Sequence, residues 1–520
     1  MNDPLGHWPS TIPGAARNAA EQWPEALALI EGDRRWNFAE LWTDARASAS
    51  ACLASGLRRG DRVAIWAPNG RAWILAALGA LSLGAVIVPL NTRFKGREAG
   101  DLLRRAKVSI LFTVASFLGV DYPALIAEED LPDLRETVLL DGIDTFLARG
   151  IGAGDPEVDA ALAKVEPDDI SDIIFTSGTT GAPKGALTAH GQVTQVFGDW
   201  ARRVDLRQGD RYLIANPFFH TFGYKAGWVA CLITGAAITP LPTFDVAETV
   251  RQIEHNRISF LPGPPTIYQA LLAQLAGGKP RDFSSLRVAV TGAAPVPPVL
   301  VERMRSELGM TNVVNGYGMT ECGAISMTRQ GDDAETIANT CGYPLPGMEI
   351  RCVDDDGRDV AAGEAGEILV RSHAVMRGYL DDPAATAEAI DPDGWLHTGD
   401  VGVLDTRGYL RITDRKKDMY ISGGFNCYPA EIEKLLCAHP AIEMAAVVGV
   451  ADERMGEVGK AFVVLRPAMT TTAAEIVEWS RRTMANYKAP RFIEFVAELP
   501  RNAAGKVLRV DLRTRASARG

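Results

Sequence analysis

The sequence predicts an α/β fold: a large N-terminal domain of parallel-rich sheets covered by helices, with a small β-rich subdomain, and then a small α+β C-terminal domain. Three observations support this prediction. Strand-like and helix-like segments alternate over most of the chain. Two long uncharged stretches each divide at a glycine into a helix-like half and a β-branched half, and turn signals multiply after about residue 340.

The two uncharged stretches are Ala72–Leu90 and Ala226–Phe244. The first divides at Gly84 and the second near Gly235, so each predicts a buried helix that leads into a buried strand. An apolar run of about 18 residues can span a bilayer, but the β-branched second halves favour strands of covered sheets. We therefore expect no membrane span.

The alternation is clearest in the middle of the chain. Asp172–Phe175 (DIIF) predicts a short buried strand, and Asp245 is a suitable N-cap for a helix with Val250 and Ile253 on its apolar face. The other elements expected here are strands at Arg211–Ala215, Ile258–Leu261, Leu286–Val290 and Thr311–Val314, and helices at Gly191–Val204 and Val299–Leu308. This order predicts parallel sheets with helices on both faces, so functional loops should follow the carboxyl ends of the strands.

After about residue 340 the sequence pattern changes to short β-rich runs separated by turns. Turn signals such as Asp356-Gly357 and Arg407-Gly408 separate short β-rich runs and predict hairpins. The C-terminal part predicts a small α+β unit with helices at Ala430–Ala438 and Ala473–Met484, and strands at Ala445–Val450, Ala461–Leu465 and Phe492–Val496. No long flexible linker is visible, so any domain junction must be short.

Composition excludes several classes of protein. With 520 residues, 47% hydrophobic and 23% charged, the chain is that of an ordinary globular protein rather than a disordered one. The net charge of −11 argues against a nucleic acid polymer or an anionic membrane as the main partner. The 7 cysteines show no CxxC spacing and Met1–Ser10 lacks a secretory signal, so we expect reduced thiols and a cytoplasmic location.

The strand Asp172–Phe175 is followed directly by Thr176–Gly185, which reads TSGTTGAPKG. Glycines let backbone N–H groups approach a ligand closely, and hydroxyls and a lysine donate hydrogen bonds to anionic oxygens. This loop therefore predicts a polyphosphate site. It is not a Walker A loop, because it contains no Gly-Lys-Ser/Thr triplet.

This loop resembles the phosphate loop of the acyl-adenylate-forming enzymes, a family of acyl-CoA synthetases, amino-acid adenylation domains and beetle luciferases. Seven further segments resemble family motifs in the family's order: Asn216–Gly223 (NPFFHTFG), Thr291–Pro295 (TGAAP), Asn315–Glu321 (NGYGMTE), Trp395–Asp400 (WLHTGD), Arg411–Lys417 (RITDRKK), Gly423–Glu431 (GGFNCYPAE) and Pro500–Lys506 (PRNAAGK). The resemblance implies that a carboxylate and ATP give acyl-AMP and pyrophosphate. A thiol, usually that of coenzyme A, then displaces AMP to form a thioester. ATP, Mg²⁺ and coenzyme A are the cofactors implied.

The resemblance also assigns the nucleotide site. Lys184 would hold the β- and γ-phosphates together with loop residues, and Tyr317 would lie on the adenine ring. Glu321 would hold Mg²⁺, with Thr320 beside the α-phosphate. Asp400 would accept hydrogen bonds from the ribose hydroxyls. The complete ATP-binding set implied is Thr176, Ser177, Gly178, Thr179, Thr180, Lys184, Gly292, Ala293, Ala294, Asn315, Gly316, Tyr317, Thr320, Asp400, Ile412, Arg415 and Lys506.

Lys506 matches the family's C-terminal lysine, which meets the substrate carboxylate and the α-phosphate during adenylation. An ammonium group there offsets the repulsion between two anions that are about to bond. The resemblance thus makes Lys506, Thr320, Glu321 and Lys184 the catalytic residues.

Lys417 matches the family's hinge. The resemblance implies an N-terminal adenylate-forming domain at 1–416 and a mobile C-terminal domain at 417–520 that swings about this residue between the two half-reactions. The swing would withdraw Lys506 and bring Gly423, Gly424 and Phe425 to the coenzyme A side.

The family's acyl pocket would here involve His220, Phe222, Tyr224, Lys225, Gly318 and Met319. Amino-acid adenylation domains carry a carboxylate in this region, and Phe218–Gly227 contains no acid, which disfavours an amino-acid substrate. The segment is similar to that of family members that activate a bicyclic indanedione propanoate in steroid degradation, so we expect a hydrophobic, cyclic acid. Lys225 would then either meet a ring ketone or extend its ammonium group to solvent. His220 would either gate the pocket or pack in the core.

Several alternatives stay open at this point. The acid could be a medium-chain fatty or aryl acid, and a stand-alone adenylating enzyme would load a carrier protein instead of coenzyme A. Nothing distinctive supports luciferase-type oxidation. The non-enzyme alternative is a nucleotide-binding regulatory protein, which the presence of Lys506, Glu321 and Lys184 disfavours. A homodimer is one option for the assembly.

Overall fold

The structure, a computed structural model, describes residues 8–152, 154–176, 183–276, 280–292, 296–415, 418–422, 425–452, 455–484, 486–501 and 507–517. The chain divides into two compact units. Unit 1 comprises Met1–Glu349 and Arg371–Trp395, and unit 2 comprises Ile350–Val370 and Leu396–Gly520. The expected boundary before Lys417 stays a prediction, since residues 416 and 417 lie outside the described ranges.

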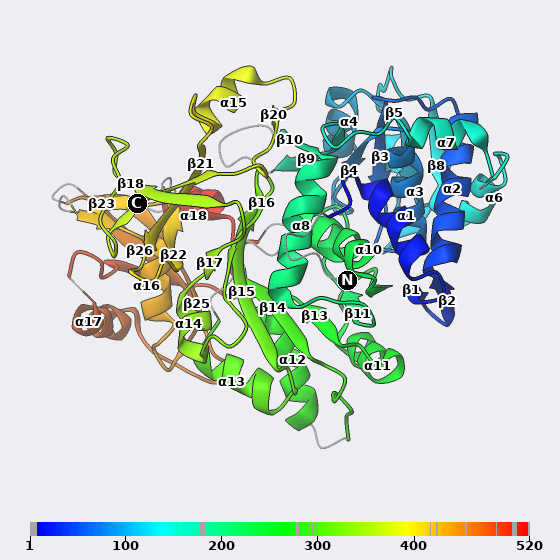
Figure 1. The fold of residues 1–520 in the computed structure, drawn as a ribbon. Coiled ribbons are helices and arrows are strands. Elements are labelled where there is room, and N and C mark those ends of the chain that lie inside the picture. The colour runs from blue at the N-terminus through cyan, green and yellow to red at the C-terminus, as the bar shows by residue number, and fades with distance from the viewer. Residues whose placement is uncertain are drawn as a thin grey trace. The chain divides into compact units, whose positions relative to one another are not determined.

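Unit 1 contains, among the described residues, a seven-stranded sheet in the order β20-β10-β9-β4-β3-β5-β8 (Figure 1). Neighbouring strands from β9 to β8 are parallel, whereas β10 pairs antiparallel with both β9 and β20. The strands are β3 (Arg62–Trp66), β4 (Val86–Pro89), β5 (Val108–Thr113), β8 (Glu136–Leu139), β9 (Ile170–Thr176), β10 (Lys184–Ala189) and β20 (Gly378–Tyr379).

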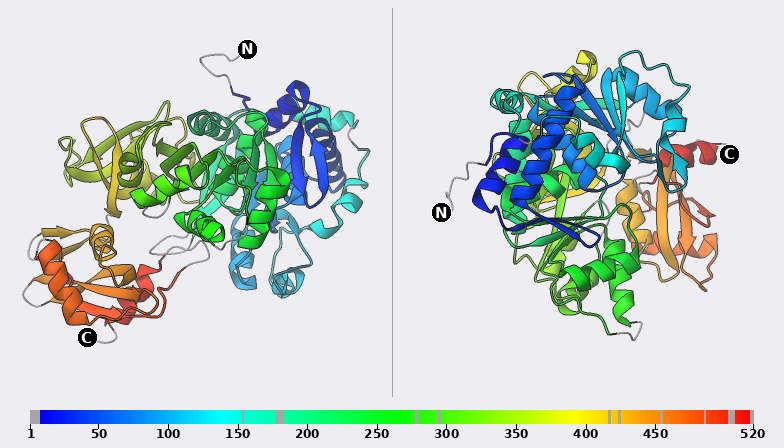
Figure 2. Two further views of the ribbon diagram at one scale, coloured as in Figure 1. Left: turned by 90° about the horizontal axis from the view of Figure 1, so that it is seen from below. Right: turned by 90° about the vertical axis from the view of Figure 1, so that its right-hand side faces the viewer.

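The second sheet of unit 1 has nine described strands in the order β17-β16-β15-β14-β13-β11-β12-β1-β2. Those from β15 to β1 pair in parallel, and the outer ones pair antiparallel. They are β1 (Leu27–Glu31), β2 (Arg34–Asn37), β11 (Arg211–Ile214), β12 (Ala237–Pro240), β13 (Phe260–Pro262), β14 (Val288–Gly292), β15 (Asn312–Met319), β16 (Gly323–Met327) and β17 (Tyr343–Pro344). Because β1 pairs with β12, the blue N-terminal hairpin lies beside green strands from the middle of the chain (Figures 1 and 2).

Helices connect these strands and cover the sheets (Figures 1 and 2). In unit 1 they are α1 (Ile12–Gln22), α2 (Phe38–Ala54), α3 (Arg71–Ser82), α4 (Gly96–Arg105), α5 (Tyr122–Ile126), α6 (Ile143–Leu147), α7 (Pro156–Leu162), α8 (His190–Val204), α9 (Thr221–Gly223), a π-helix (Tyr224–Val229), α10 (Ala230–Thr234), α11 (Val246–Asn256), α12 (Pro265–Ala276), α13 (Pro298–Ser306), α14 (Ala334–Asn339) and α15 (Pro383–Ala389). A short 3-10 helix (Leu140–Gly142) and the small hairpin β6 (Ser116–Phe117) and β7 (Val120–Asp121) complete the unit. The predicted parallel sheets covered by helices are confirmed.

The glycines that divide the two uncharged stretches end helices. Gly84, with φ of +73°, follows α3 and precedes the fully buried strand β4. Gly235 is the C-cap of α10, also at φ of +73°, and β12 follows. Glycine adopts this left-handed conformation without the steric cost that other residues meet. Both stretches therefore form a helix and a buried strand, and no helix in the described ranges is long and apolar enough to cross a membrane.

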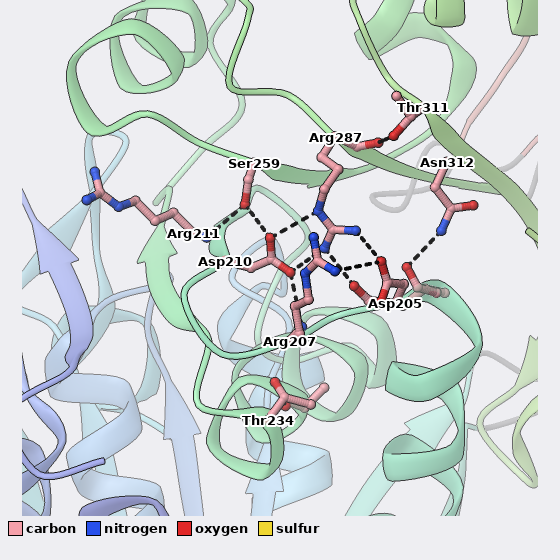
Figure 3. Close-up of polar contacts among 11 residues, drawn as sticks. Asp205, Arg207, Asp210, Arg211, Thr234, Ser259, Arg287, Thr311 and Asn312 are labelled. Atoms are coloured by element: carbon pink, nitrogen blue, oxygen red, sulfur yellow. Dashed lines mark hydrogen bonds and ion pairs between the residues drawn. The ribbon is translucent and has the colours of Figure 1, made fainter. Parts of the chain in front are cut away.

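A cluster of ion pairs ties together the amino-terminal ends of three parallel strands of the nine-stranded sheet (Figure 3). Arg287, just before β14, contacts the carboxylates of both Asp205 and Asp210. Ser259, just before β13, donates a hydrogen bond from Oγ to Asp210 Oδ1 at 2.7 Å, and Asp210 directly precedes β11. Asp205 is the C-cap of α8. This cluster stabilises the amino-terminal ends of the strands. The predicted functional loops leave the sheet at the other side, from the carboxyl ends.

Unit 2 contains a four-stranded sheet, in which β21 pairs antiparallel with β19 and β22, and a five-stranded sheet among its described residues. The strands of the first are β18 (Glu349–Val353), β19 (Ala365–Arg371), β21 (Leu396–Leu404) and β22 (Leu410–Arg415); those of the second are β23 (Tyr420–Ser422), β24 (Phe425–Cys427), β25 (Ile442–Asp452), β26 (Gly456–Leu465) and β27 (Phe492–Phe495). The helices α16 (Pro429–Leu436), α17 (Ala473–Thr483) and α18 (Arg509–Ser517) accompany the five-stranded sheet. Both the β-rich part and the small α+β part agree with the prediction.

Candidate active site

The predicted phosphate loop leaves the seven-stranded sheet on β9 and returns on β10. Thr176, the last residue of β9, pairs with Lys184, the first of β10, and Thr176 Oγ1 donates a hydrogen bond to the Lys184 carbonyl oxygen at 3.3 Å. Both residues are half-buried. The antiparallel pair thus holds the two ends of the loop together. Its residues Ser177, Gly178, Thr179 and Thr180 lie outside the described ranges.

The segment expected to bind adenine lies on a strand and not in a loop. The prediction ended this strand at Val314, but β15 continues to Met319 because β16 pairs with it antiparallel. Gly318 permits this pairing, since a Cβ there would lie 2.3 Å from the Gly323 carbonyl oxygen. Gly316, Tyr317, Gly318 and Met319 are consequently carried at the C-terminal end of β15.

Asn315 is buried on β15, and its side chain binds the backbone at the end of α14. Its Nδ2 donates hydrogen bonds to the carbonyl oxygens of Ile337 and Thr340, at 3.1 and 2.9 Å, so the side-chain donors point to the end of α14. Gly292 ends the neighbouring β14, opposite Gly316, and a Cβ on Gly292 would lie 3.0 Å from the Gly316 carbonyl oxygen. The close approach of the two strands therefore depends on glycine at this position. Ala293 and Ala294 lie outside the described ranges.

Thr320 and Glu321 occupy the turn between β15 and β16. Glu321 is only 8% exposed, and Tyr379 Oη donates a hydrogen bond to its Oε1 at 3.1 Å. The ring of Tyr379 also lies near Lys184, whose Nζ is 5.2 Å from the ring centroid. Burial raises the pKa of Tyr379 well above its usual value, and the charge of Glu321 raises it further. The hydroxyl therefore stays protonated and acts as a donor.

Sequence reasoning missed Tyr379. It lies on the short strand β20, nearly 200 residues from Lys184, and only the pairing of β20 with β10 brings the two together. Within the chain its neighbourhood shows only an Arg377-Gly378-Tyr379 run in a turn-rich region. Such a run carries no chemical signal of its own.

The carboxylate of Glu321 fits a role in holding Mg²⁺ as part of MgATP. In the described part of the chain, no group of three or more His, Cys, Asp and Glu side chains could hold a metal ion. Mg²⁺ in nucleotide sites commonly takes one or two carboxylates and completes its octahedron with phosphate oxygens and water. A single buried carboxylate with a fixed orientation is suited to that arrangement.

The segment expected on the acyl side begins with His220, the N-cap of α9, whose Nδ1 accepts a hydrogen bond from the Phe222 amide at 3.3 Å. The residue keeps an exposed edge, but protein surrounds most of the imidazole. Burial by that protein lowers the pKa of His220. The neutral imidazole is therefore favoured at pH 7. Phe222 packs edge-on against Trp200 at a centroid distance of 6.2 Å.

A π-helix, Tyr224–Val229, follows α9 directly. Lys225, near its start, forms an ion pair with Asp172 of β9, with Nζ 2.8 Å from Oδ1. Tyr224 stacks on Trp228 with a centroid distance of 5.1 Å, and Trp73 of α3 contacts both rings. The segment expected on the acyl side therefore carries buried aromatic rings. The expectation that Lys225 extends its ammonium group to solvent is wrong, because that group is buried in an ion pair with Asp172.

The nucleotide residues expected in unit 2 lie on neighbouring strands. Asp400 of β21 is buried and pairs through its backbone with Arg415 of β22, while Ile412 pairs with Gly402. The register brings the backbones of Asp400 and Arg415 together, and their shared contact with one ribose stays a prediction. Lys417, Gly423, Gly424 and Lys506 lie outside the described ranges, and Phe425 begins β24. The C-terminal assignments therefore stay predictions.

In unit 1, a hydroxyl- and glycine-rich loop with a lysine, an oriented buried carboxylate and a glycine-lined strand pair all lie at the carboxyl ends of parallel strands. In α/β sheets, ligands bind at these ends. The fold and the order of these parts define an acyl-adenylate-forming enzyme.

Comparison with known families agrees with this class. Residues 16–380 match the model of the AMP-binding enzyme family, and residues 431–506 match that of the AMP-binding enzyme C-terminal domain. The chain belongs to the AMP-binding enzyme family, and it is an acid–thiol ligase of the AMP-forming acyl-CoA synthetase type.

Three relatives illustrate the similarity. A Mycobacterium tuberculosis 3-[(3aS,4S,7aS)-7a-methyl-1,5-dioxo-octahydro-1H-inden-4-yl]propanoyl:CoA ligase is 51% identical over 97% of this chain and 98% of its own. The ligase of the same name from Rhodococcus jostii is 46% identical, with 97% of this chain and 98% of its own covered. The solved O-succinylbenzoate coenzyme A synthetase of Bacillus subtilis, in complex with ATP and magnesium ion, is 30% identical and superposes with a TM-score of 0.83 over 96% of this chain and 99% of that chain.

Proposed function

We propose that this synthetase activates a bicyclic, steroid-derived propanoate as its coenzyme A thioester. The observation that carries the proposal is the identity of 51% and 46% to two ligases named for an indanedione propanoate, over nearly the whole chain. The absence of an acidic residue from Phe218–Gly227 and the buried aromatic rings of Tyr224 and Trp228 support an apolar, non-amino acid substrate. A medium-chain fatty or aryl acid is the second candidate.

In the first half-reaction, a carboxylate oxygen of the acid attacks the α-phosphorus of ATP, and the bond to pyrophosphate breaks. Lys184 and the loop from Thr176 to Thr180 would bind the β- and γ-phosphates, whose charge grows as pyrophosphate leaves. Glu321 would hold Mg²⁺, which neutralises phosphate charge when bound, and Tyr379 would keep that carboxylate in one orientation. Lys506 would lie between the two anions that react.

In the second half-reaction, the thiol sulfur of coenzyme A attacks the acyl carbon and the mixed anhydride bond to AMP breaks. Rotation of a C-terminal domain at 417–520 about Lys417 would withdraw Lys506 and bring Gly423, Gly424 and Phe425 to the thiol. Asp400 would retain the ribose of AMP in both states. A cytoplasmic location and a homodimer complete the proposal, since coenzyme A and ATP are cytoplasmic substrates and many soluble enzymes form symmetric dimers.

The test is release of AMP that depends on both an acid and coenzyme A. The acid panel comprises linear acids from C4 to C16, aryl propanoates, and the indanedione propanoate together with its reduced bicyclic analogues. We expect the highest kcat/KM with the bicyclic propanoates. Higher kcat/KM with a linear or aryl acid would contradict the proposed substrate, and preference for a phosphopantetheinyl protein over coenzyme A would contradict the proposed acceptor.

A further inference from the structure

The ion pair between Asp172 and Lys225 is buried almost completely. The two side chains are 0% and 2% exposed, and Lys225 Nζ lies 2.8 Å from Asp172 Oδ1. Ser171 Oγ donates a hydrogen bond to the other carboxylate oxygen, Oδ2, at 2.7 Å. Removing two charges from water is costly, and apolar residues of similar volume in such a place are often equally stable or more so. Stability alone therefore gives no reason for charges at these positions.

The two partners belong to different parts of unit 1. Asp172 lies on β9 of the seven-stranded sheet, in register with Ile87 of β4 and Thr188 of β10. Lys225 lies on the segment that connects β11 and β12 of the nine-stranded sheet. The pair is thus a direct polar link between a strand of the seven-stranded sheet and a connecting segment of the nine-stranded sheet.

On the Asp172 side, the link reaches the phosphate loop. Asp172 and Thr176 are four residues apart on one strand, so their side chains lie on the same face of the sheet. Thr176 in turn pairs with Lys184. A shift of Asp172 along or away from the sheet would therefore move the strand on which the loop begins.

On the Lys225 side, the link reaches the acyl-side segment. Lys225 Nζ lies 5.9 Å from the centroid of the Tyr224 ring, which stacks on Trp228 and contacts Trp73. The π-helix that carries these residues is a rare conformation and includes Gly227 with non-helical φ and ψ of −89° and −108°. The kink at Gly227 interrupts the regular helical backbone of this segment, so a side-chain anchor helps to determine where the segment lies.

We propose that Asp172 and Lys225 are a positioning pair that aligns the acid with ATP for adenylation. The inference rests on the proposed placement of the acid beside the π-helix and of the phosphates at the β9–β10 loop. The ion pair holds the π-helix at a constant distance from β9, and so sets the distance between the acid's carboxylate and the α-phosphate. Lys225 acts through the position of its helix and not by touching the substrate, because its ammonium group is buried against Asp172.

This role predicts an effect on one half-reaction only. Adenylation requires two separate reactants to meet, so a displacement of about 1 Å can lower its rate by about 100-fold. A supplied acyl adenylate already contains the bond between the acyl group and the phosphate. Its reaction with coenzyme A therefore does not depend on that alignment.

The experiment compares wild type with the neutral double variant Asp172→Asn/Lys225→Met. Asparagine has the shape of aspartate and can still accept the hydrogen bond from Ser171, and methionine is an unbranched side chain one atom shorter than lysine. We measure ATP–pyrophosphate exchange with an acid that the wild type activates, thioester formation from the synthetic adenylate of the same acid, and thermal unfolding. We expect exchange to fall by about 10-fold to 100-fold through kcat, with the KM for ATP and the second half-reaction changed by less than about threefold. The unfolding temperature should stay close to that of wild type.

Two further variants make the comparison decisive. Lys225→Arg keeps an ion pair of altered length, so it should fold even if the double variant does not, and should show the same selective loss at about threefold to tenfold. The comparison variant is Arg71→Met/Asp44→Asn, which removes a second ion pair of unit 1, with Nη2 2.6 Å from Oδ2 and side chains 6% and 27% exposed, and should affect both half-reactions alike.

Equal loss of both half-reactions, or unchanged exchange in a folded double variant, would overturn the positioning role. Wild-type exchange that depends on no acid in the panel would refute the proposed function and the inference together. Wild-type exchange that the double variant retains would refute the inference alone.

Discussion

Tyr379 Oη donates a hydrogen bond of 3.1 Å to Glu321 Oε1, while the same tyrosine ring lies 5.2 Å from Lys184 Nζ. Three side chains that lie far apart in the sequence are therefore neighbours in the structure, with Tyr379 between the other two. The phenol leaves the second carboxylate oxygen of Glu321 available and prevents rotation of the carboxylate. Its buried hydroxyl stays protonated, since burial and the charge of Glu321 both raise its pKa.

Replacement of Tyr379 should weaken nucleotide binding more than it slows chemistry. In Tyr379→Phe the ring stays above Lys184, but the hydrogen bond to Glu321 is lost, and a bond to a charged group contributes about 1.5–3 kcal/mol. We expect the KM for MgATP to rise by about tenfold, with the KM for the acid unchanged. Steady-state kinetics at varied MgATP measures both values.

Tyr122→Phe is the matched control for this change. Tyr122 also donates a hydrogen bond from its hydroxyl, to the Thr92 carbonyl oxygen at 2.7 Å, but it contacts none of the proposed site residues. The Tyr122→Phe variant should have the same KM for MgATP as wild type. An equal rise in both variants would show that Tyr379 has no specific connection with the nucleotide.

Lys506→Ala should lower adenylation by about 10²–10³, the usual loss when one preorganised donor is removed from the reacting charges. Thioester formation from a supplied acyl adenylate should be retained, because the ammonium group has no remaining part in that step. ATP–pyrophosphate exchange and thioester formation measure the two steps separately. Lys434→Ala, at an exposed lysine of α16, serves as the control and should change neither. Undiminished exchange in Lys506→Ala would refute the assignment.

Lys417→Pro should impair the second half-reaction more than the first. Proline restricts φ to about −65° and removes a backbone N–H, so rotation about this residue becomes difficult. We expect a loss of about tenfold or more in thioester formation and a smaller loss in pyrophosphate exchange. Lys417→Ala, which removes the charge and keeps backbone freedom, should retain both steps. If Lys417→Ala loses as much as Lys417→Pro, the side chain matters and the hinge assignment is wrong.

His190 should make the folding of unit 1 sensitive to acid. It is fully buried at the start of α8, where its Nδ1 accepts a hydrogen bond from the Ile12 amide at 3.3 Å, and burial lowers its pKa from 6.5 to about 4. Between these two values the unfolded chain binds a proton that the folded chain does not, so stability falls as the pH falls. At pH 5 this histidine should lower the free energy of unfolding by about 2 kcal/mol relative to pH 7.

His190→Asn tests this dependence, because the amide oxygen can still accept from Ile12 and does not titrate. Urea titrations followed by tryptophan fluorescence at pH 7, 6 and 5 give the free energy of unfolding for both proteins. The loss on acidification should be smaller in the variant by about 2 kcal/mol. Parallel losses in the two proteins would show that His190 does not contribute.

The sequence predicted the elements of this fold well wherever one segment carried its own signal. Gly84 and Gly235 divide uncharged stretches at points where only glycine adopts the left-handed conformation easily, and both end helices in the structure. Asp245 caps α11 as expected, with Oδ1 accepting from the Glu248 amide at 2.8 Å. Such signals are local, so a short window contains all the information that they need.

Boundaries that depend on a partner strand were predicted less well. The strand ending at Val314 was expected to stop before the NGYGM segment, whereas β15 extends to Met319 because β16 folds back on it. The pairing of β1 with β12 likewise joins segments about 200 residues apart, and no periodicity in either segment indicates that partner. Strand length and sheet order depend on hydrogen bonds with distant chain segments, and a local pattern does not contain them.

The sequence alone therefore determined the class of this protein: an ordered set of motifs, each contiguous and each rich in the groups that bind phosphate, ribose or a metal ion, was sufficient to indicate acyl adenylation. Only the tertiary structure decided how single side chains cooperate. It joined Tyr379 to Glu321 and Lys184, and it placed the Lys225 ammonium group against Asp172, because both contacts link strands and helices far apart in the chain. Chemical type can be read along a chain, whereas the partner of a buried polar group depends on which surfaces fold against each other.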